Sequence, residues 1–237
     1  MKKLLLLFVL FVNLAFSQEA GFEKQYADDY LKAVKKLQTF SPQLDSVTKK
    51  LKVPQKEVIS VVFPEMVRYS IYSDAAQMAM LELFYVERGT KYANFSVGAF
   101  QIKPSFVEEL EKEVSQNNQL TKKYAHILFS DTISAKKARE TRLQRLKNIC
   151  YQLVYACCFY EIMTLKYKNR TFKDKEEQLR LFATAYNSGM NMSYESLIKM
   201  QKVKLFPEGK ICFNCTNYNY SEIVVEFYKK LSNTKKI

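Results

Sequence analysis

Apolar residues recur every three or four positions along most of the chain, the spacing that places them on one face of a helix. Only 5 glycines and 5 prolines interrupt the 237 residues, so breaks between helices are few. The pattern predicts an all-α fold, in which Pro64 kinks or restarts its helix. The expected helices cover residues 22–39, 44–51, 54–69, 74–87, 104–115, 135–166, 175–187, 194–202 and 220–231.

The longest expected helix, over 135–166, has apolar positions around much of its circumference and is predicted to be the central core helix. Cys150, Cys157 and Cys158 all lie on it. Neighbouring residues of a helix point about 100° apart, and cysteine packs well as a small apolar side chain. We therefore predict that the adjacent pair Cys157 and Cys158 packs in the core and has no redox role.

The start of the chain has the three parts of a secretory signal peptide. Lys2 and Lys3 precede an apolar run over 4–12, which is too short for a comfortable membrane span, and Ala15-Phe16-Ser17 follows as a small-residue cleavage site. The predicted organisation is a signal peptide over 1–17, an N-terminal helical extension over 18–53 and a main domain over 54–237. Cleavage near Ser17 would export the protein to the periplasm or the exterior of a bacterium.

The chain is strongly basic, with 37 Lys+Arg against 24 Asp+Glu and a formal net charge of +13. Removal of the two signal-peptide lysines leaves 35 − 24, or +11. Such a surface attracts anionic partners, and export favours an anionic envelope surface or wall polymer and argues against nucleic acid. Solvated lysine-rich helix faces explain much of the same charge.

The remaining cysteines and the single histidine give little support to metal or covalent chemistry. Cys212 and Cys215 are the better pair for a disulfide, although their spacing also occurs in redox motifs and zinc half-sites. Neither of those contexts is visible around them. His126 has no motif that marks a nucleophile beside it. We expect no metal and no cofactor.

Glu65 is the sharpest candidate for acid–base chemistry. Val61 and Val62 lie about one turn before it on the expected helix, and an apolar flank disfavours the ionised carboxylate and so raises its pKa. Arg68, three positions later, would instead hold the carboxylate charged as an ion pair. The sequence leaves these two outcomes open.

Two later segments carry further polar and small residues. The first, Phe95 to Pro104, contains Gly98, where the absence of a side chain would let backbone amides approach a sugar. The second is Ala185-Tyr186-Asn187-Ser188-Gly189, in which the tyrosine ring can stack on a sugar and the asparagine amide can hydrogen-bond to it. Each segment alone is a weak signal, and their order after a helix-borne glutamate makes it stronger.

In this order the three segments resemble lytic transglycosylases and goose-type lysozymes. Those proteins share a helix-borne glutamate, then Ser-x-x-Gly-Leu-Met-Gln-Ile-x-Pro, then Ala-Tyr-Asn-Ala-Gly. The resemblance extends from about residue 58 to residue 190. Ala99 and Phe100 stand in place of the usual Leu and Met, and Ser188 in place of the second Ala.

The resemblance implies a lysozyme-like helical fold and peptidoglycan glycan strands as the substrate. Glu65 would protonate the bond between N-acetylmuramic acid and N-acetylglucosamine and then act as base. In lytic transglycosylases the substrate's acetamide is thought to assist and a 1,6-anhydro ring to form, so no second carboxylate is needed. The residues that shape the glycan cleft would be Ser96, Gly98, Gln101, Tyr186 and Asn187.

Glu65 and Ser96 lie 31 positions apart (96 − 65), more than is usual in that family. We therefore expect an insertion over 70–94, which contains an extra amphipathic helix that lines or covers the cleft. With a different alignment Glu82 or Glu87 would be the acid, and Asp74 is a further conceivable carboxylate.

Three other functions stay open from the sequence. A non-catalytic glycan-binding or scaffold protein would keep the fold, with Ala99, Phe100 and Ser188 as signs of lost turnover. A hydrolytic lysozyme would use the same acid, and a basic helical adaptor of the envelope would use its aromatic residues only for packing. The sequence does not predict the oligomeric state or the choice between endo and exo cleavage.

Overall fold

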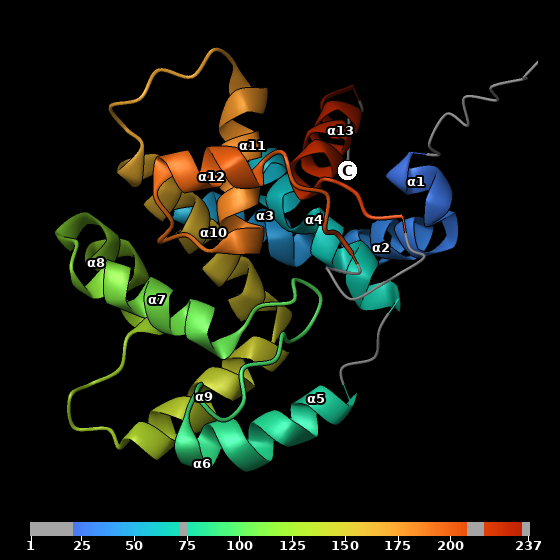
Figure 1. Cartoon of the computed structure of the whole chain (residues 1–237). Helices are drawn as coiled ribbons and strands as arrows, with labels where there is room; N and C mark the ends of the chain where they lie inside the picture. Colours follow the sequence, from blue (N-terminus) through green and yellow to red (C-terminus); the bar gives the residue numbers. More distant parts are fainter. Residues whose placement is uncertain (1–20, 72–74, 208–215, 234–237) are drawn as a thin grey trace, which may run out of the picture.

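The computed structural model describes residues 21–71, 75–207 and 216–233, and over these residues the fold is all-α (Figure 1). The first half holds α1 Phe22–Gln25, α2 Ala27–Thr39, α3 Ser41–Leu51, α4 Gln55–Ile71, α5 Ala75–Met80, the π-helix η1 Leu81–Tyr85 and α6 Val86–Arg88. The second half holds α7 Pro104–Ser115, α8 Asn118–Tyr124, the 3₁₀ helix η2 Ala125–Ile127, α9 Ala135–Lys147, α10 Ile149–Lys166, α11 Lys175–Ser188, α12 Tyr194–Met200 and α13 Tyr220–Asn233.

Helix α4 lies in the core against α2, α11 and α13. Its residues 58–67 are buried without a break, and α4 continues through Pro64 as a single helix. The ring of Phe63 stacks on that of Phe227 in α13, with centroids 3.5 Å apart. The ring of Tyr30 in α2 packs edge-on against the ring of Phe63, with centroids 5.0 Å apart. Because α2 and α3 pack against α4 and α10, the expected N-terminal extension shares the core of the main domain.

The single helix expected over 135–166 is wrong, because Asn148 divides it into α9 and α10. Asn148 is extended, with φ −99° and ψ 122°, and its side chain accepts a hydrogen bond of 2.8 Å from the backbone N–H of Cys150. This is an N-cap, which satisfies a donor that a new helix leaves free. The apolar spacing runs across the break and therefore hides it.

The adjacent cysteines of α10, Cys157 and Cys158, pack in the core as the sequence predicts. Cys157 and Cys158 are buried free thiols, whereas Cys150 is exposed. Burial raises the pKa of the Cys157 thiol to about 12 and also raises the pKa of Cys158. Both are packing residues in the described core.

Residues 75–94 form a small lobe of α5, η1 and α6 that packs against α9 (Figure 1). Arg142 of α9 joins this lobe to α7. Its guanidinium makes two hydrogen bonds to Glu111, of 3.0 and 2.6 Å, and donates one of 2.6 Å to the hydroxyl of Tyr85. The lobe is thus fixed to one side of α7.

Some predictions fall outside the described residues. The signal peptide over 1–17 and the pair Cys212 and Cys215 are among them. No helix in the described ranges is both long and apolar enough to cross a membrane.

Candidate active site

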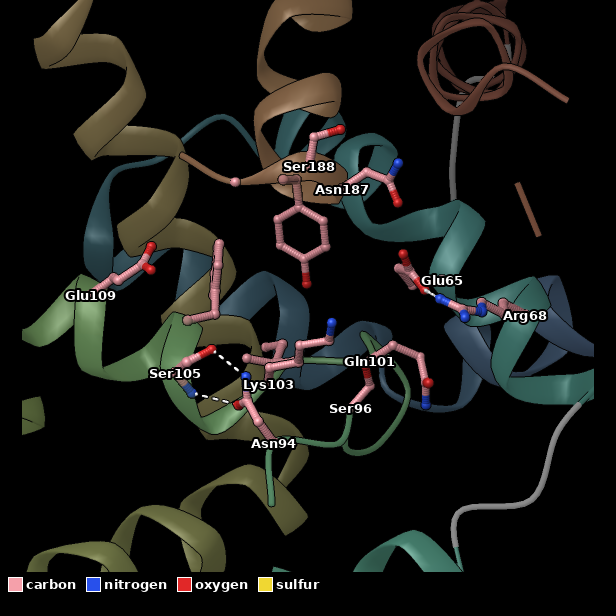
Figure 2. Close-up of a pocket in the computed structure, with 14 residues that line it drawn as sticks. Glu65, Arg68, Asn94, Ser96, Gln101, Lys103, Ser105, Glu109, Asn187 and Ser188 are labelled. Atoms are coloured by element: carbon pink, nitrogen blue, oxygen red, sulfur yellow. Dashed lines mark hydrogen bonds and ion pairs between the residues drawn. The ribbon is translucent and has the colours of Figure 1, made fainter. Parts of the chain in front are cut away.

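A cleft of about 240 Å³ opens between α4, the loop before α7, the first turns of α7 and the end of α11 (Figure 2). Four of the five substrate-binding residues expected from the sequence line it together with Glu65. The lining residues are Glu65, Arg68, Asn94, Ser96, Gln101, Ile102, Lys103, Ser105, Phe106, Glu109, Tyr186, Asn187, Ser188 and Gly189.

Glu65 is a buried carboxyl group at the wall of this cleft, with only 4% of its surface exposed. Its Oε2 atom has no hydrogen-bond partner among the described residues. The Nη1 atom of Arg68 lies 3.6 Å from Oε2, which makes an ion pair but is too long for a hydrogen bond. Figure 2 shows this ion pair at one end of the cleft, which both residues line.

Burial raises the pKa of Glu65 to about 7, although Arg68 and Lys103 act in the opposite direction. The sequence leaves open whether the apolar flank raises the pKa of Glu65 or Arg68 holds the carboxylate charged. In the structure the effect of burial on this pKa is larger than the effect of Arg68. A carboxyl group with this pKa is available as a proton donor near neutral pH.

The segment after Ser96 forms a tight turn that faces Glu65 across the cleft. The backbone N–H of Val97 donates to the carbonyl of Ile102 at 3.0 Å, and the reverse bond is 3.1 Å long. Gly98 and Gln101 both have positive φ, at 71° and 48°. The side-chain amide of Gln101 donates to the carbonyl of Gly98 at 3.0 Å, so the turn holds Gln101 at the cleft.

Gly98 is not among the cleft-lining residues, so the structure gives it a role other than contact with a sugar. A Cβ atom at this position would lie 2.1 Å from the side-chain nitrogen of Gln152. Gln152 is buried in α10, accepts a hydrogen bond of 3.0 Å from the backbone N–H of Phe100 and donates one of 2.8 Å to Leu146. The glycine is needed because the turn packs directly on this glutamine.

Tyr186 joins the end of α11 to the same turn. Its hydroxyl donates a hydrogen bond of 2.8 Å to the carbonyl of Phe100. The ring packs edge-on against Phe106 and Phe159, with centroids 5.3 and 5.2 Å away. Burial raises the pKa of this hydroxyl well above its usual value, so it stays a donor. Gly189, with φ 128°, then ends the helix at the rim of the cleft.

The carboxyl groups that the sequence offers as alternatives to Glu65 lie outside the cleft where they are described. The side chains of Glu82 and Glu87 are 54% and 51% exposed, form ion pairs with Lys147 and Lys136, and do not line the cleft. The expected helix in the insertion forms as α5, η1 and α6, but none of its described residues lines the cleft either. Asp74 lies outside the described residues.

Sequence reasoning missed the contribution of α7 and of the loop before it. The side chain of Asn94 donates to Ser105 Oγ at 2.8 Å and accepts from its backbone N–H at 3.0 Å, which fixes the first turn of α7 to the loop (Figure 2). Ser105, Phe106 and Glu109 then line the cleft from one face of the helix. The sequence does contain a signal for this face: the polar residues Ser105 and Glu109 lie one turn apart on the helix expected over 104–115.

The described residues contain no cluster of three or more His, Cys, Asp or Glu side chains that would hold a metal ion. No protein-family model, no curated protein and no solved structure matches the chain. Function must therefore be inferred from the cleft. Its chemistry is that of one buried acid facing a polar cavity that also holds a second carboxyl group, three side-chain amides, a tyrosine ring and two cations.

Proposed function

We propose that this protein is an exported peptidoglycan lytic transglycosylase with a lysozyme-like fold, which cleaves the bond between N-acetylmuramic acid and N-acetylglucosamine. The observation that carries the proposal is the burial and the raised pKa of the Glu65 side chain. It is a buried carboxyl group with a pKa of about 7 and an oxygen that lacks a hydrogen-bond partner among the described residues, in a cleft that also holds Ser96, Gln101, Tyr186 and Asn187.

In the proposed mechanism the protonated Glu65 donates its proton to the glycosidic oxygen as the bond breaks. The resulting carboxylate lies beside Arg68, at 3.6 Å, and is stabilised by it until it takes a proton back. It removes this proton from the C6 hydroxyl of the muramic acid, whose oxygen closes the 1,6-anhydro ring. The acetamide of the substrate stabilises the positive charge at the sugar carbon, so these steps need one protein carboxyl group.

Two of the three departures from the family sequence, Ala99 and Phe100, are buried and do not line the cleft, whereas the third, Ser188, lines it. Phe100 contributes its backbone, which bonds to Gln152 and Tyr186. The substitutions at Ala99 and Phe100 therefore change core packing behind the turn, and Ser188 replaces one small residue with another at the cleft. This supports retained turnover over a purely glycan-binding role.

A hydrolytic lysozyme is the second candidate, and Glu109 is the observation that favours it. This residue places a second carboxyl group in the same cleft, across from Glu65 (Figure 2). A second carboxylate can activate a water molecule for attack on the sugar. The products distinguish the two reactions, because hydrolysis leaves a reducing end and transglycosylation a 1,6-anhydro end.

The test is digestion of purified peptidoglycan by the wild type and by Glu65→Gln, with mass spectrometry of the released fragments. Release of 1,6-anhydro muropeptides by the wild type alone supports the proposal, and reducing-end products support the hydrolase. Sedimentation with the wall without release indicates a glycan-binding protein. Full activity of the Glu65→Gln protein would exclude Glu65 as the acid.

A further inference from the structure

Among the described residues that line the cleft, the cations are Arg68 and Lys103, and they come from two different walls. Arg68 lies on α4, one turn after Glu65, and its side chain is 38% exposed. Lys103 lies in the loop before α7, is exposed, and is near enough to Glu65 to lower the pKa of that carboxyl group. Figure 2 shows its side chain pointing into the cleft from the wall opposite Asn187. Both cations can therefore reach a ligand that contacts Glu65.

The protein supplies these two cations with one nearby carboxylate, that of Glu65. It pairs with Arg68 at 3.6 Å, whereas the ammonium group of Lys103 forms no hydrogen bond or salt bridge with any described residue. Below its pKa of about 7 Glu65 is protonated, and both cations then remain without a carboxylate beside them. The other acid that lines the cleft, Glu109, lies at the far end (Figure 2).

A bound glycan displaces water from the cleft. Like charges repel each other more strongly as water leaves, and a buried cation without a partner is costly. A ligand that brings an anion to Arg68 and Lys103 is therefore favoured over a neutral one. Guanidinium and ammonium groups both form strong hydrogen bonds with carboxylates.

The proposed reaction limits where on the glycan this carboxylate can lie. Glu65 gives its proton to the oxygen on C1 of N-acetylmuramic acid, and the lactyl ether is attached to C3 of the same ring. The carboxylates of a stem peptide are further away, beyond the lactyl group and one or more amino acids. We propose that Arg68 and Lys103 bind a carboxylate of the muramic acid unit at the scissile bond, foremost that of its free lactyl group. This inference rests on the proposed function.

The preferred substrate is then a glycan strand without peptides, because the lactyl carboxylate is free only where the stem peptide has been removed. The reaction that supplies this substrate is hydrolysis of the amide bond between the lactyl group and the peptide, which consumes water and releases the peptide amine. The bound carboxylate would also raise the pKa of Glu65, since a second negative charge nearby disfavours ionisation. It would thereby help to keep the acid protonated.

Two pairs of probes test the carboxylate and its source. The first pair is a peptide-free tetrasaccharide of alternating N-acetylglucosamine and N-acetylmuramic acid, and the same compound with its lactyl carboxylates converted to methylamides. The second pair is the tetrasaccharide with stem peptides, and the same compound with its peptide carboxylates amidated. Binding is measured by calorimetry in the Glu65→Gln background, which prevents cleavage and keeps a neutral side chain at position 65.

We expect the free lactyl carboxylate to bind about tenfold tighter than its methylamide, as for a hydrogen bond between charged groups. Arg68→Gln with Lys103→Met should abolish this ratio. Lys32→Met, which removes an exposed lysine outside the cleft, should keep it. In the wild type, the limb of the kcat profile at high pH should lie at higher pH for peptide-free strands than for intact peptidoglycan.

Circular dichroism of each variant confirms that it is folded before its titration is compared. Equal affinity within both pairs of probes, or a preference that survives the double substitution, would overturn the inference. A preference found only in the second pair, and lost in the double variant, supports carboxylate binding and assigns its source to the stem peptide. If the wild type cleaves peptidoglycan and neither pair shows a preference, only this inference fails. If it neither binds nor cleaves any glycan, the proposed function fails and the inference fails with it.

Discussion

The hydroxyl of Tyr186 donates a hydrogen bond of 2.8 Å to the backbone carbonyl of Phe100, and this bond joins the end of α11 to the turn that carries Gln101. The two segments are distant in the sequence, and both line the cleft beside Glu65. The tyrosine therefore positions the opposite wall of the cleft as well as contributing its ring.

Tyr186→Phe tests this positioning role. The ring and its contacts with Phe106 and Phe159 remain, whereas the carbonyl of Phe100 loses its partner, which costs about 1 kcal/mol of unfolding free energy. Because the turn loses a tether, kcat on peptidoglycan should fall about tenfold. Urea denaturation and muropeptide release measure the two effects. Unchanged activity with reduced stability would limit the bond to a structural role.

A second prediction concerns the contact between Gly98 and Gln152. Gly98→Ala should destabilise the protein through both its φ of 71° and the clash with the glutamine side chain. In combination with Gln152→Ala the clash disappears, so the double variant should lose less stability than the sum of the singles by about 1 kcal/mol or more.

Gly89 offers the control for that cycle. It also has positive φ, at 87°, but a Cβ atom there would meet nothing within 4 Å. Gly89→Ala and Gln152→Ala should therefore be additive in unfolding free energy. Additivity in the Gly98 cycle as well would show that the close packing on Gln152 does not determine the need for glycine.

The pH profile follows from the acid role of Glu65. Because the acid must be protonated, kcat/KM should fall as the pH rises through about 7. Arg68 lowers the pKa of Glu65, so Arg68→Gln should move this limb of the profile to higher pH. Lys103→Gln should move it less, in the same direction, and Lys32→Gln, whose side chain pairs with Asp29, should leave it in place. A limb that shifts to lower pH in Arg68→Gln would contradict the assignment.

Stability should depend on pH through the same group. At pH values well below 4.5 the Glu65 side chain is protonated in both the folded and the unfolded chain, and between 4.5 and about 7 only the unfolded chain ionises. Ionisation therefore favours unfolding, and the stability contribution of this residue is lost as the pH rises. Glu65→Gln should raise the unfolding free energy by about 3 kcal/mol at pH 8 and change it little at pH 4.

Urea denaturation at the two pH values measures this difference, with Glu140→Gln as a control that removes a partly exposed carboxylate. A Glu65→Gln protein that is less stable than the wild type at pH 8 would mean that the ion pair with Arg68 outweighs burial.

Helix periodicity predicts most of the described fold because amphipathic helices carry their own pattern. It fails at Asn148, where the apolar spacing continues through a capped break, and at α8, which is only 7 residues long. Glu65 could be chosen from its apolar flank, but its pKa depends on tertiary burial that no local pattern contains. For the same reason the sequence predicts contact between Gly98 and a sugar, whereas the actual neighbour of Gly98 is Gln152, from a helix distant in the sequence.

The buried thiols of Cys157 and Cys158 have a consequence for the order of events during folding. A thiol exchanges disulfides as its thiolate, and burial raises the pKa of both groups. Once α10 is enclosed, these two cysteines are withdrawn from oxidation, while Cys150 stays accessible. In an oxidising environment the set of cysteines that can pair is thus decided by timing: closure of the core before contact with an oxidant protects the native thiols, and late closure exposes them to mispairing.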